Sequence, residues 1–569
     1  MVFFMRHGRH AGNSVGTDMI KSQVRACVER CIAAGCDQGY WQDSAAAGYA
    51  IEVPKREGQG DFSTNFAMVT AGRMKAKPRD IAARLVTLLA DEPLLSRVEV
   101  AGPGFINLFV QPSAWTTILA PLYQQDERFG ISQAGAGCKV MVEFVSANPT
   151  GPLSVGHGRN AVLGDAIARV LTAAGYAVHR EYYFNDAGRQ MRVLGESTRA
   201  RCMELLDLPA EFPEDGYQGD YIYDIARSLV AEQGKGLQDA PLELFTAHAR
   251  EQIFTDIKAT LTRIGIEFDS YFNERSLYED GLIDQVVSDL RAKGLVYEQE
   301  GATWFKSTEF GQEQDRVIIK SSGEPTYRLP DIAYHREKFK RGYDWMVNVF
   351  GSDHIATVPD VLAGVRALGL DAERITVVLY QFVTLLRGGK QVKMSTRKAT
   401  FVTVDELVDE VGADAMRFFF LMRKPDSQIE FDLDLAKKQS QENPVYYVQY
   451  AHARLCSIER QAAEQGVQPG GPDDADLLAL LTEPEELALL KSMAAYPELV
   501  EGAARELAPH RLIFYLMELA GLFHSYYNKH KVLGDDMRLS QARLLLMGAL
   551  KRVFRNGLAL MRLSAPERM

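Results

Sequence analysis

The residues best suited to bind a ligand lie in the stretch ANPTGPLSVGHGRN, which covers residues 147–160. His157 stands there among glycines and prolines, between an apolar run and a run with helical spacing. Gly156 has no Cβ, so the flat ring or ribose of a nucleotide could approach the backbone. A histidine at a helix start adds a donor to the free N–H groups. Taken alone, the stretch is better interpreted as a tight turn with a capping histidine, because it has neither GxGxxG nor GxxxxGK[ST].

A second stretch whose residues could take part in chemistry is GKQVKMSTRKATF, residues 389–401. It places Lys393, Arg397 and Lys398 on a polar loop after a predicted strand. Thr403 and Glu406 have the spacing of a capping box, which predicts a helix directly behind the loop. By itself this stretch is typical of a solvated basic loop.

A strand–helix–strand unit must position the first stretch. Residues 139–145 form a near-continuous apolar run, as expected for a parallel strand buried on both faces. Helical spacing over 160–176 ends at Gly175, and 177–184 reads as the second strand. Further α/β elements are predicted by a strand at 344–350, a helix over 357–369 and a strand over 375–386. The fold class is therefore α/β and multidomain, with a Rossmann-type parallel sheet whose first turn carries His157.

The length of 569 residues predicts two to four domains. The opening MVFFMRHG has the RHG of histidine phosphatases, but a disordered extension is the preferred interpretation. We expect the following organisation: a disordered extension at 1–18, a small α/β domain at 19–112, a linker at 113–137, a catalytic domain at 138–435 with a helical insertion at about 190–300, and a helical domain at 436–569.

Composition excludes several classes of protein. The net charge of −11 argues against a general nucleic-acid-coating protein, although local basic patches remain open. No apolar run is long enough for a membrane-spanning helix, so we expect no membrane association. The six sparse cysteines suggest a reducing compartment, the cytoplasm. Cys27, Cys31 and Cys36 lack CxxC spacing, so no metal site is predicted and small buried thiols are expected.

Together, the two stretches resemble the HxGH and KMSKS signatures of class I aminoacyl-tRNA synthetases, in the right order. Blocks such as REYYFNDAGRQM, TYRLPDIAYH, NPVYYVQYAHAR and LFHSYYNKHKVL narrow the resemblance to arginyl-tRNA synthetases, over residues 19–569. One departure concerns Ser154, which stands where the family normally has a histidine. In the second signature, Thr396 replaces a lysine and Ala399 a glycine.

The resemblance implies that L-arginine is activated with ATP, accompanied by Mg²⁺, and transferred to the terminal adenosine of arginine tRNA. We expect a monomer. Ser154 leaves open a tRNA-binding relative with impaired aminoacylation, because a hydroxyl cannot carry positive charge. A different nucleotidyl-transfer enzyme on the same fold is a third hypothesis.

The same resemblance implies roles for individual residues. His157, Lys393 and Ser154 are expected to act in catalysis, and the nucleotide is expected to contact Gly156, His157, Asn160, Gly351, Asp353, His354, Lys393, Met394 and Ser395. For Asp353 and His354, a helix N-cap is an equal alternative. The expected arginine contacts are Glu143, Ser146, Asn148, Tyr327 and Asp331.

The stretch FHSYYNKHK interleaves aromatic and basic residues, as a stacking surface for unpaired bases would. The net charge of residues 521–569 is +6, from nine Lys/Arg and three Asp/Glu. Tyr526, Tyr527, Asn528 and Lys529 are therefore candidates for contact with the anticodon of the tRNA. At least one tyrosine of the pair is expected to face the helical core instead.

Overall fold

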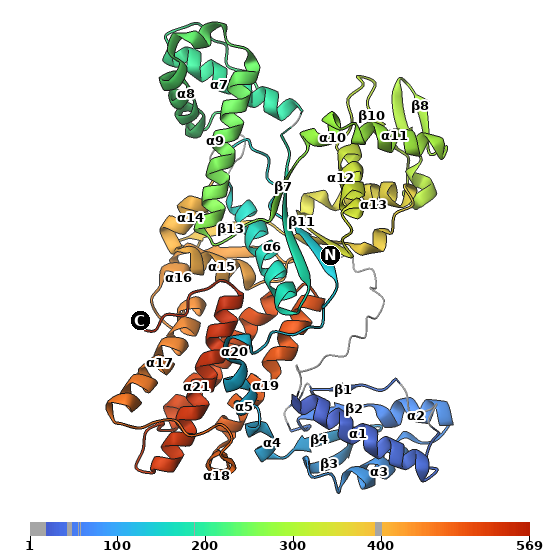
Figure 1. Cartoon of the computed structure of the whole chain (residues 1–569), viewed down its shortest axis with the longest axis vertical. Coiled ribbons are helices and arrows are strands. Elements are labelled where there is room, and N and C mark those ends of the chain that lie inside the picture. Colours follow the sequence, from blue (N-terminus) through green and yellow to red (C-terminus); the bar gives the residue numbers. More distant parts are fainter. Residues whose placement is uncertain (1–18, 43–47, 55, 57, 187, 393–400) are drawn as a thin grey trace.

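The computed structural model describes residues 19–42, 48–54, 56, 58–186, 188–392 and 401–569. The predicted extension at 1–18 lies outside these residues. The centre of the molecule is a five-stranded parallel sheet of strand order β12-β11-β5-β6-β7 (Figure 1). Its strands are β5 (Lys139–Glu143), β6 (Ala177–Phe184), β7 (Ser270–Asn273), β11 (Trp345–Gly351) and β12 (Ile375–Tyr380). The Rossmann-type parallel sheet predicted from the apolar runs is confirmed.

Helix α6 (Val155–Ala173) follows β5 and packs against the sheet. A Cβ on Gly164 would lie 2.2 Å from the ring of Phe144, so this glycine allows the close approach of helix and strand. The prediction that the helix begins at residue 160 is wrong, because Ser154 is already its N-cap. Gly175 follows the helix with a φ of +88°, in agreement with the predicted C-terminal stop.

The single strand predicted over 375–386 is also wrong. After β12 the chain leaves the central sheet, and β13 (Val383–Arg387) joins a separate sheet of order β14-β13-β15. The partners of β13 are β14 (Lys390–Gln391) and β15 (Ile429–Asp432). Buried Arg159 on α6 donates to the backbone carbonyls of Gln381 and Phe382 at the break. An apolar run cannot reveal such a break, because both strands are buried.

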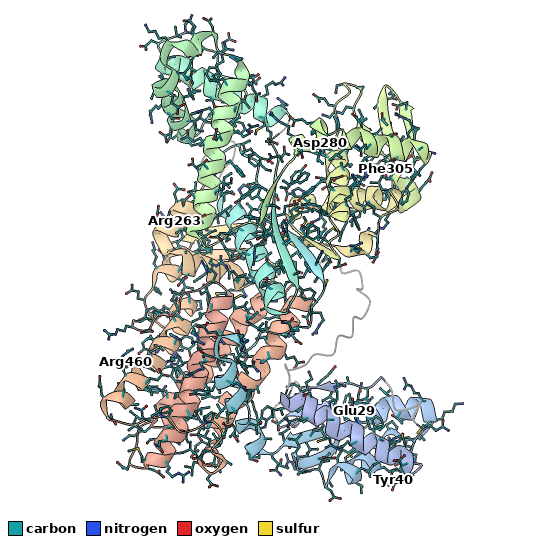
Figure 2. All side chains as sticks on the ribbon, viewed as in Figure 1. Glu29, Tyr40, Arg263, Asp280, Phe305 and Arg460 are labelled. Carbon is teal, nitrogen blue, oxygen red and sulfur yellow. The ribbon has the colours of Figure 1, made fainter. Side chains whose placement is uncertain are left out.

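The predicted helical insertion at 190–300 is divided by strand β7, which adds to the edge of the central sheet. Before β7 a helical arm contains α7 (Arg189–Leu205), α8 (Asp220–Gln233) and α9 (Leu242–Arg263). After β7 a second lobe contains α10 (Arg275–Glu279), α11 (Leu282–Ala292), β8 (Val296–Gln299), β9 (Ala302–Phe305), β10 (Arg316–Ile319), α12 (Arg328–Lys340) and α13 (Val358–Ala367). The sheet lies between arm and lobe, which carry the labelled residues Arg263 and Phe305 (Figure 2).

The N-terminal body has a four-stranded antiparallel sheet of order β1-β2-β4-β3. Its elements are α1 (Met19–Asp37), β1 (Ile51–Glu52), β2 (Phe62–Thr64), α2 (Phe66–Met74), α3 (Pro78–Leu89), β3 (Leu95–Ala101) and β4 (Phe105–Val110). The predicted linker forms α4 (Pro112–Thr116) and α5 (Leu119–Gln125). It is docked on the C-terminal helices, because the hydroxyl of Tyr123 donates to the carbonyl of Leu545 at 2.8 Å.

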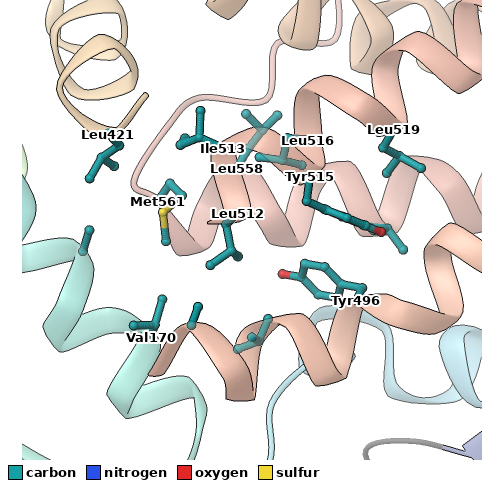
Figure 3. Packing of buried hydrophobic residues seen from close by; sticks show 14 of the residues in the cluster. Val170, Leu421, Tyr496, Leu512, Ile513, Tyr515, Leu516, Leu519, Leu558 and Met561 are labelled. Atoms are coloured by element: carbon teal, nitrogen blue, oxygen red, sulfur yellow. The ribbon is translucent and has the colours of Figure 1, made fainter. Parts of the chain in front are cut away.

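Beyond the second signature the chain is almost wholly helical. Its helices are α14 (Val404–Val411), α15 (Ala413–Leu421), α16 (Leu433–Lys437), α17 (Pro444–Glu464), α18 (Ala475–Leu478), α19 (Pro484–Arg505), α20 (His510–Lys529) and α21 (Met537–Leu560). Their apolar core includes Leu512, Leu516 and Tyr496, and Val170 of α6 borders the same cluster (Figure 3). The helical domain and the sheet therefore share one core. Across the described ranges, no helix combines the length and apolar composition that crossing a membrane requires.

Candidate active site

The candidate site lies where parallel strands β5, β11 and β12 end and α6 begins. Parallel sheets place ligands in the crevice at the carboxyl ends of their strands. Gly156 lies in the first turn of α6, and a Cβ built on it would meet only the hydroxyl of Ser154, at 3.7 Å. The backbone therefore faces open space at this position, which leaves room for a nucleotide.

His157 lies in the first turn of α6 and is held by the N-cap residue. The backbone N–H of Ser154 donates to Nδ1 of His157 at 3.2 Å, and the hydroxyl of Ser154 is also 3.2 Å from that atom. Burial lowers the pKa of His157, although the carboxylate of Asp353 acts in the opposite direction. The neutral imidazole is therefore favoured at neutral pH, and its Nε2 carries the hydrogen-bond donor.

Asn160 does not have the predicted role of a direct nucleotide contact. It is 4% exposed, and its amide oxygen accepts from the N–H of Val145 at 2.7 Å. Its amide nitrogen donates to the carbonyl of Val349 at 2.9 Å. Because both ends of the amide are used within the protein, Asn160 holds the ends of β5 and β11 together.

The turn after β11 carries the other predicted nucleotide contacts. Gly351 ends the strand, and Asp353 and His354 are exposed in the short helical turn Ser352–Ala356. The carboxylate of Asp353 acts on the pKa of His157, so the turn borders the start of α6. Both side chains are thus accessible beside the candidate site.

The second signature's Lys393, Met394 and Ser395 lie outside the described residues, but the chain that follows them is bonded to the first signature. The N–H of Val404 donates to the carbonyl of Leu153 at 2.8 Å, and the N–H of Val155 donates to the carbonyl of Val402 at 3.2 Å. The predicted capping box of Thr403 and Glu406 is confirmed. The first signature is therefore joined by a short antiparallel bridge to residues 402–404, which follow the second signature in the sequence.

Acidic side chains of β5, α12 and the segment after β7 form a cluster, which we call the acidic pocket. Burial, followed by the nearby carboxyls of Glu143 and Glu274, raises the pKa of Asp331 to about 8. Burial also raises the pKa of Glu274, whose carboxyl accepts from the hydroxyl of Tyr183 at 3.0 Å. Burial is the larger cause of both shifts and the neighbouring carboxyls add to it, so a cationic ligand would stabilise the ionised forms of these groups.

Glu143 is not a free counter-ion for that ligand. Its carboxylate is buried and forms an ion pair with Nζ of fully buried Lys338 at 2.5 Å. The same lysine donates to the side-chain oxygen of Asn348 at 2.9 Å. A buried carboxylate within an apolar strand needs a partner, and here the partner is a lysine of the protein. The negative charge left for a ligand belongs to Asp331 and Glu274.

The remaining predicted arginine contacts line the approach to the pocket. Tyr327 is 75% exposed, and the amide nitrogen of Asn148 donates to the side-chain oxygen of Gln190 at 2.6 Å. The hydroxyl of Ser146 donates to Glu143 at 3.2 Å and accepts from the N–H of Tyr183 at 3.1 Å. Ser146 has a φ of +43°, an unusual value that turns the chain at the end of β5. Of the five predicted residues, the structure brings Glu143 together with Ser146 and with Asp331.

Sequence models of known families match three parts of the chain: an arginyl-tRNA synthetase N-terminal domain at 18–110, a class I (R) tRNA synthetase catalytic domain at 119–429 and a DALR anticodon-binding domain at 448–569. The arginine–tRNA ligase of Desulfotalea psychrophila is 62% identical, and the match covers 97% of this chain and all of that protein. The chain belongs to the arginyl-tRNA synthetase family. The arginine–tRNA ligase of Syntrophotalea carbinolica is 48% identical over the same shares of the two chains.

A solved structure agrees on the fold of this synthetase. The arginyl-tRNA synthetase of Thermus thermophilus superposes with a TM-score of 0.73 at 24% identity, covering 96% of this chain and all of that one. The predicted architecture is therefore confirmed over nearly the whole length.

Sequence reasoning missed three residues of the acidic pocket in this synthetase: Glu274, Lys338 and Tyr183. Lys338 follows Asp331 by seven residues and so lies on the same face of α12, a spacing that could have found it. Glu274 lies in the stretch predicted to be a helical insertion. It reaches the pocket only because β7 returns to the sheet, and no local signal predicts that.

One predicted tRNA contact of the synthetase is wrong. Tyr526 is fully buried, with its hydroxyl near Glu486 at 3.5 Å, as expected for the tyrosine that faces the core. Tyr527 is partly exposed, Asn528 is exposed, and Lys529 is exposed but paired with Glu485 at 2.6 Å.

Tyr527 belongs to a stacked surface that sequence reasoning missed. On α17, the rings of Tyr446 and Tyr450 lie 6.0 Å apart at an angle of 10°. One turn later, the guanidinium of Arg454 lies 4.6 Å from the ring of Tyr450 and 4.7 Å from that of Tyr527. All four side chains are partly exposed. We call these four residues the aromatic ladder, and such a surface suits stacking on unpaired bases.

Proposed function

We propose that this chain is an active arginine–tRNA ligase. It would activate L-arginine with ATP to arginyl-adenylate and transfer the arginyl group to the terminal adenosine of arginine tRNA. The observation that carries the proposal is the acidic pocket at the end of β5, the strand that leads into the first signature segment. The pocket would hold a cationic amino acid close to a nucleotide.

The guanidinium of the substrate would supply the positive counter-charge for the carboxyls of the acidic pocket. Its planar N–H groups suit carboxylates, so Asp331 and Glu274 are assigned to it. Lys338 balances the charge of Glu143. Glu143 and Ser146 are therefore assigned to accept hydrogen bonds from the α-amino group of the substrate arginine. Asn148 and Tyr327 line the entrance. The roles of Glu143, Ser146, Asn148, Tyr327 and Asp331 in arginine binding thus remain proposals that the geometry supports.

In the first step, an oxygen of the arginine carboxylate attacks the α-phosphorus of ATP, and the bond to the β-phosphate oxygen breaks. The carboxylate is already ionised, so the step needs alignment and charge stabilisation rather than a base. Nε2–H of His157 would donate to the nucleotide at the start of α6. Lys393 is proposed to close over the phosphates, with Met394 and Ser395 beside it.

Mg²⁺ is expected to arrive with the triphosphate. Within the described ranges, the group of three possible metal ligands is Glu483, Glu485 and His530, on the C-terminal helices. The residues around His157 do not form a comparable set, although exposed Asp353 offers one carboxylate. The protein's own side chains therefore do not fit a resident metal ion at this site.

In the second step, a ribose hydroxyl of the terminal adenosine attacks the carbonyl of the adenylate and AMP leaves. The tRNA would be held at a distance by the C-terminal helices. We assign the anticodon loop to the aromatic ladder, together with Asn528 and Lys529 at the end of α20. We also propose a monomer, which sedimentation would check. A cytoplasmic location is proposed with it.

The alternative, a tRNA-binding relative without aminoacylation, is not favoured. It rested on Ser154, and this residue is bonded to His157 rather than leaving a gap in the site.

Two assays test the proposal. The first is exchange of labelled pyrophosphate into ATP, measured with and without tRNA. The second is charging of arginine tRNA. We expect arginine-dependent exchange and stoichiometric release of AMP on charging. Citrulline, a neutral molecule of nearly the same shape, is the matched control and should not be activated. Binding of arginine tRNA without any release of AMP would favour the non-catalytic relative instead.

A further inference from the structure

Ser154 is bridged to Thr403, in the strand-like segment that follows the second signature. Its neighbours Leu153 and Val155 are hydrogen-bonded to the strand that leads into α14. Its own N–H points the other way, toward Nδ1 of His157 at 3.2 Å. The side chain of Ser154 is partly exposed, on the side of the open position at Gly156. The residue is thus fixed by its backbone and faces the nucleotide site with its hydroxyl.

The contacts of Ser154 determine which ring nitrogen of His157 carries the proton. A backbone N–H can only donate, so Nδ1 must be the acceptor and must be unprotonated. A neutral imidazole then has its single proton on Nε2. The hydroxyl of Ser154, at 3.2 Å from the same Nδ1, is placed to act as a second donor. Burial of His157, which lowers its pKa, works in the same direction.

We propose that Ser154 is a positioning residue, which holds His157 as the neutral tautomer with its Nε2–H directed at the ATP phosphates. The part that concerns ATP rests on the proposed function. A histidine at position 154, which is usual in the family, has no hydroxyl to offer to Nδ1. In this chain the departure from the signature therefore changes the way His157 is held and does not impair the enzyme.

The tautomer can be read in the free protein, without any assay of activity. The full chain is labelled with [¹⁵N]histidine, and the ring nitrogens of His157 are assigned by their loss in a His157→Gln variant. We expect a protonated Nε2 and an unprotonated Nδ1 in the wild type. A proton on Nδ1 would overturn the proposal.

Three variants separate positioning from simple helix capping. Ser154→Thr keeps both the cap and the hydroxyl donor, so tautomer and melting temperature should be unchanged. Ser154→Asp keeps the cap and the backbone donor but replaces the hydroxyl by a carboxylate, which accepts from a protonated Nδ1 in competition with the backbone N–H, so the melting temperature should hold while protons appear on Nδ1. Ser154→Ala loses both functions. If Ser154→Asp and Ser154→Ala both keep an unprotonated Nδ1, the hydroxyl has no positioning role and the proposal is wrong.

Kinetics supply the second readout. Ser154→Ala should slow adenylate formation about tenfold, the effect of one hydrogen bond to a polar group, with the KM for arginine unchanged. Ser154→Thr should restore the rate. An equal loss in both variants, or a loss confined to the KM for arginine, would contradict positioning through His157. If the wild type itself activates no arginine, the proposed function fails, while the ¹⁵N spectra still decide the role of Ser154.

Discussion

At the scale of single residues, Asp331 carries the charge that defines the substrate. Burial and the nearby carboxyls of Glu143 and Glu274 raise its pKa to about 8, and a bound guanidinium would favour its ionised form. Asp331→Asn should weaken arginine binding about 10- to 100-fold, because a charge-assisted hydrogen bond contributes about 1.5–3 kcal/mol. Calorimetric titration with arginine would measure this loss. Glu337→Gln, which alters an exposed ion pair on the same helix, is the control and should bind normally.

The same carboxyl predicts how binding and stability depend on pH. Arginine needs the ionised form, so wild-type affinity should rise between pH 6 and about 8 and then level, whereas Asp331→Asn should show little change there. The contribution of this carboxyl to the free energy of unfolding changes with pH in the opposite direction. A raised pKa in the folded state gives a contribution that is complete below about pH 4 and is lost as the pH rises toward 8. Asp331→Asn should therefore melt at a higher temperature than the wild type at pH 8. A lower melting temperature there would contradict the shifted pKa.

Prediction of the site from sequence succeeds where a residue's signal is local. Glu143 is conspicuous because a carboxylate interrupts an apolar strand, and His157 because glycines surround it. The distribution of charge in the pocket is not local, since Lys338 and Glu274 reach it from separate elements. Asn160 shows the same limit: its type suits nucleotide binding, but the strand ends at Val145 and Val349 take both sides of its amide.

At the scale of elements, helix α6 joins the active site to the helical domain. Asp165 on this helix pairs with buried Arg417 of α15 at 2.5 Å. The same guanidinium donates to the carbonyls of Ile264 after α9 and Met561 after α21. Removal of one member of a buried ion pair costs about 3–5 kcal/mol, so Arg417→Ala should lower the free energy of unfolding by that amount. Urea denaturation would measure it. Arg263→Ala, which removes exposed pairs with Asp405 and Asp409, should cost less than about 1 kcal/mol.

Helices α17 and α20 carry the aromatic ladder, and its function can be tested without the active site. Stacking of a base on an aromatic side chain contributes about 1–3 kcal/mol, so Tyr450→Ala should weaken tRNA binding about 5- to 100-fold. Arginine-dependent pyrophosphate exchange, measured at saturating tRNA, should change far less. Filter binding would give the affinities, with Tyr223→Ala on the helical arm as the aromatic control. Equal losses for the two variants would exclude a specific role for the ladder.

Strands that are buried on both faces were easier to predict from the sequence than strands that are only partly buried. Strands β5 and β11 are mostly apolar and buried and were found, whereas four-residue β7 is only partly buried and was missed. The start of α6 was predicted too late, because glycines in its first turn suggest a loop and the cap at Ser154 was not recognised. Tyr526 and Tyr527 are adjacent on one helix and point in different directions, so sequence alone could say that one is buried but not which.

At the scale of the whole molecule, the N-terminal body is attached by few contacts. Lys491 of α19 pairs with Asp61 at 2.5 Å and lies 5.4 Å from the ring of Trp115, and Lys21 pairs with Glu498. In contrast, Asp126 is bonded to Arg555 of α21, so the linker stays docked. Figure 1 shows this body set apart from the central sheet. Exposed ion pairs contribute at most about 1 kcal/mol each, so the attachment is weak.

The weak attachment predicts motion of the N-terminal body that salt controls. A Lys21→Ala, Lys491→Ala double variant should have a larger radius of gyration than the wild type in small-angle X-ray scattering. At about 1 M salt, where charges are screened beyond about 3 Å, the wild type should approach the variant. Lys437→Ala, which removes an exposed pair with Glu410 inside one body, is the control and should scatter as the wild type does. Because both lysines lie far from the acidic pocket, arginine binding should not change. Identical scattering of all three proteins at low salt would mean that apolar packing around Trp115, rather than the two lysines, fixes the N-terminal body.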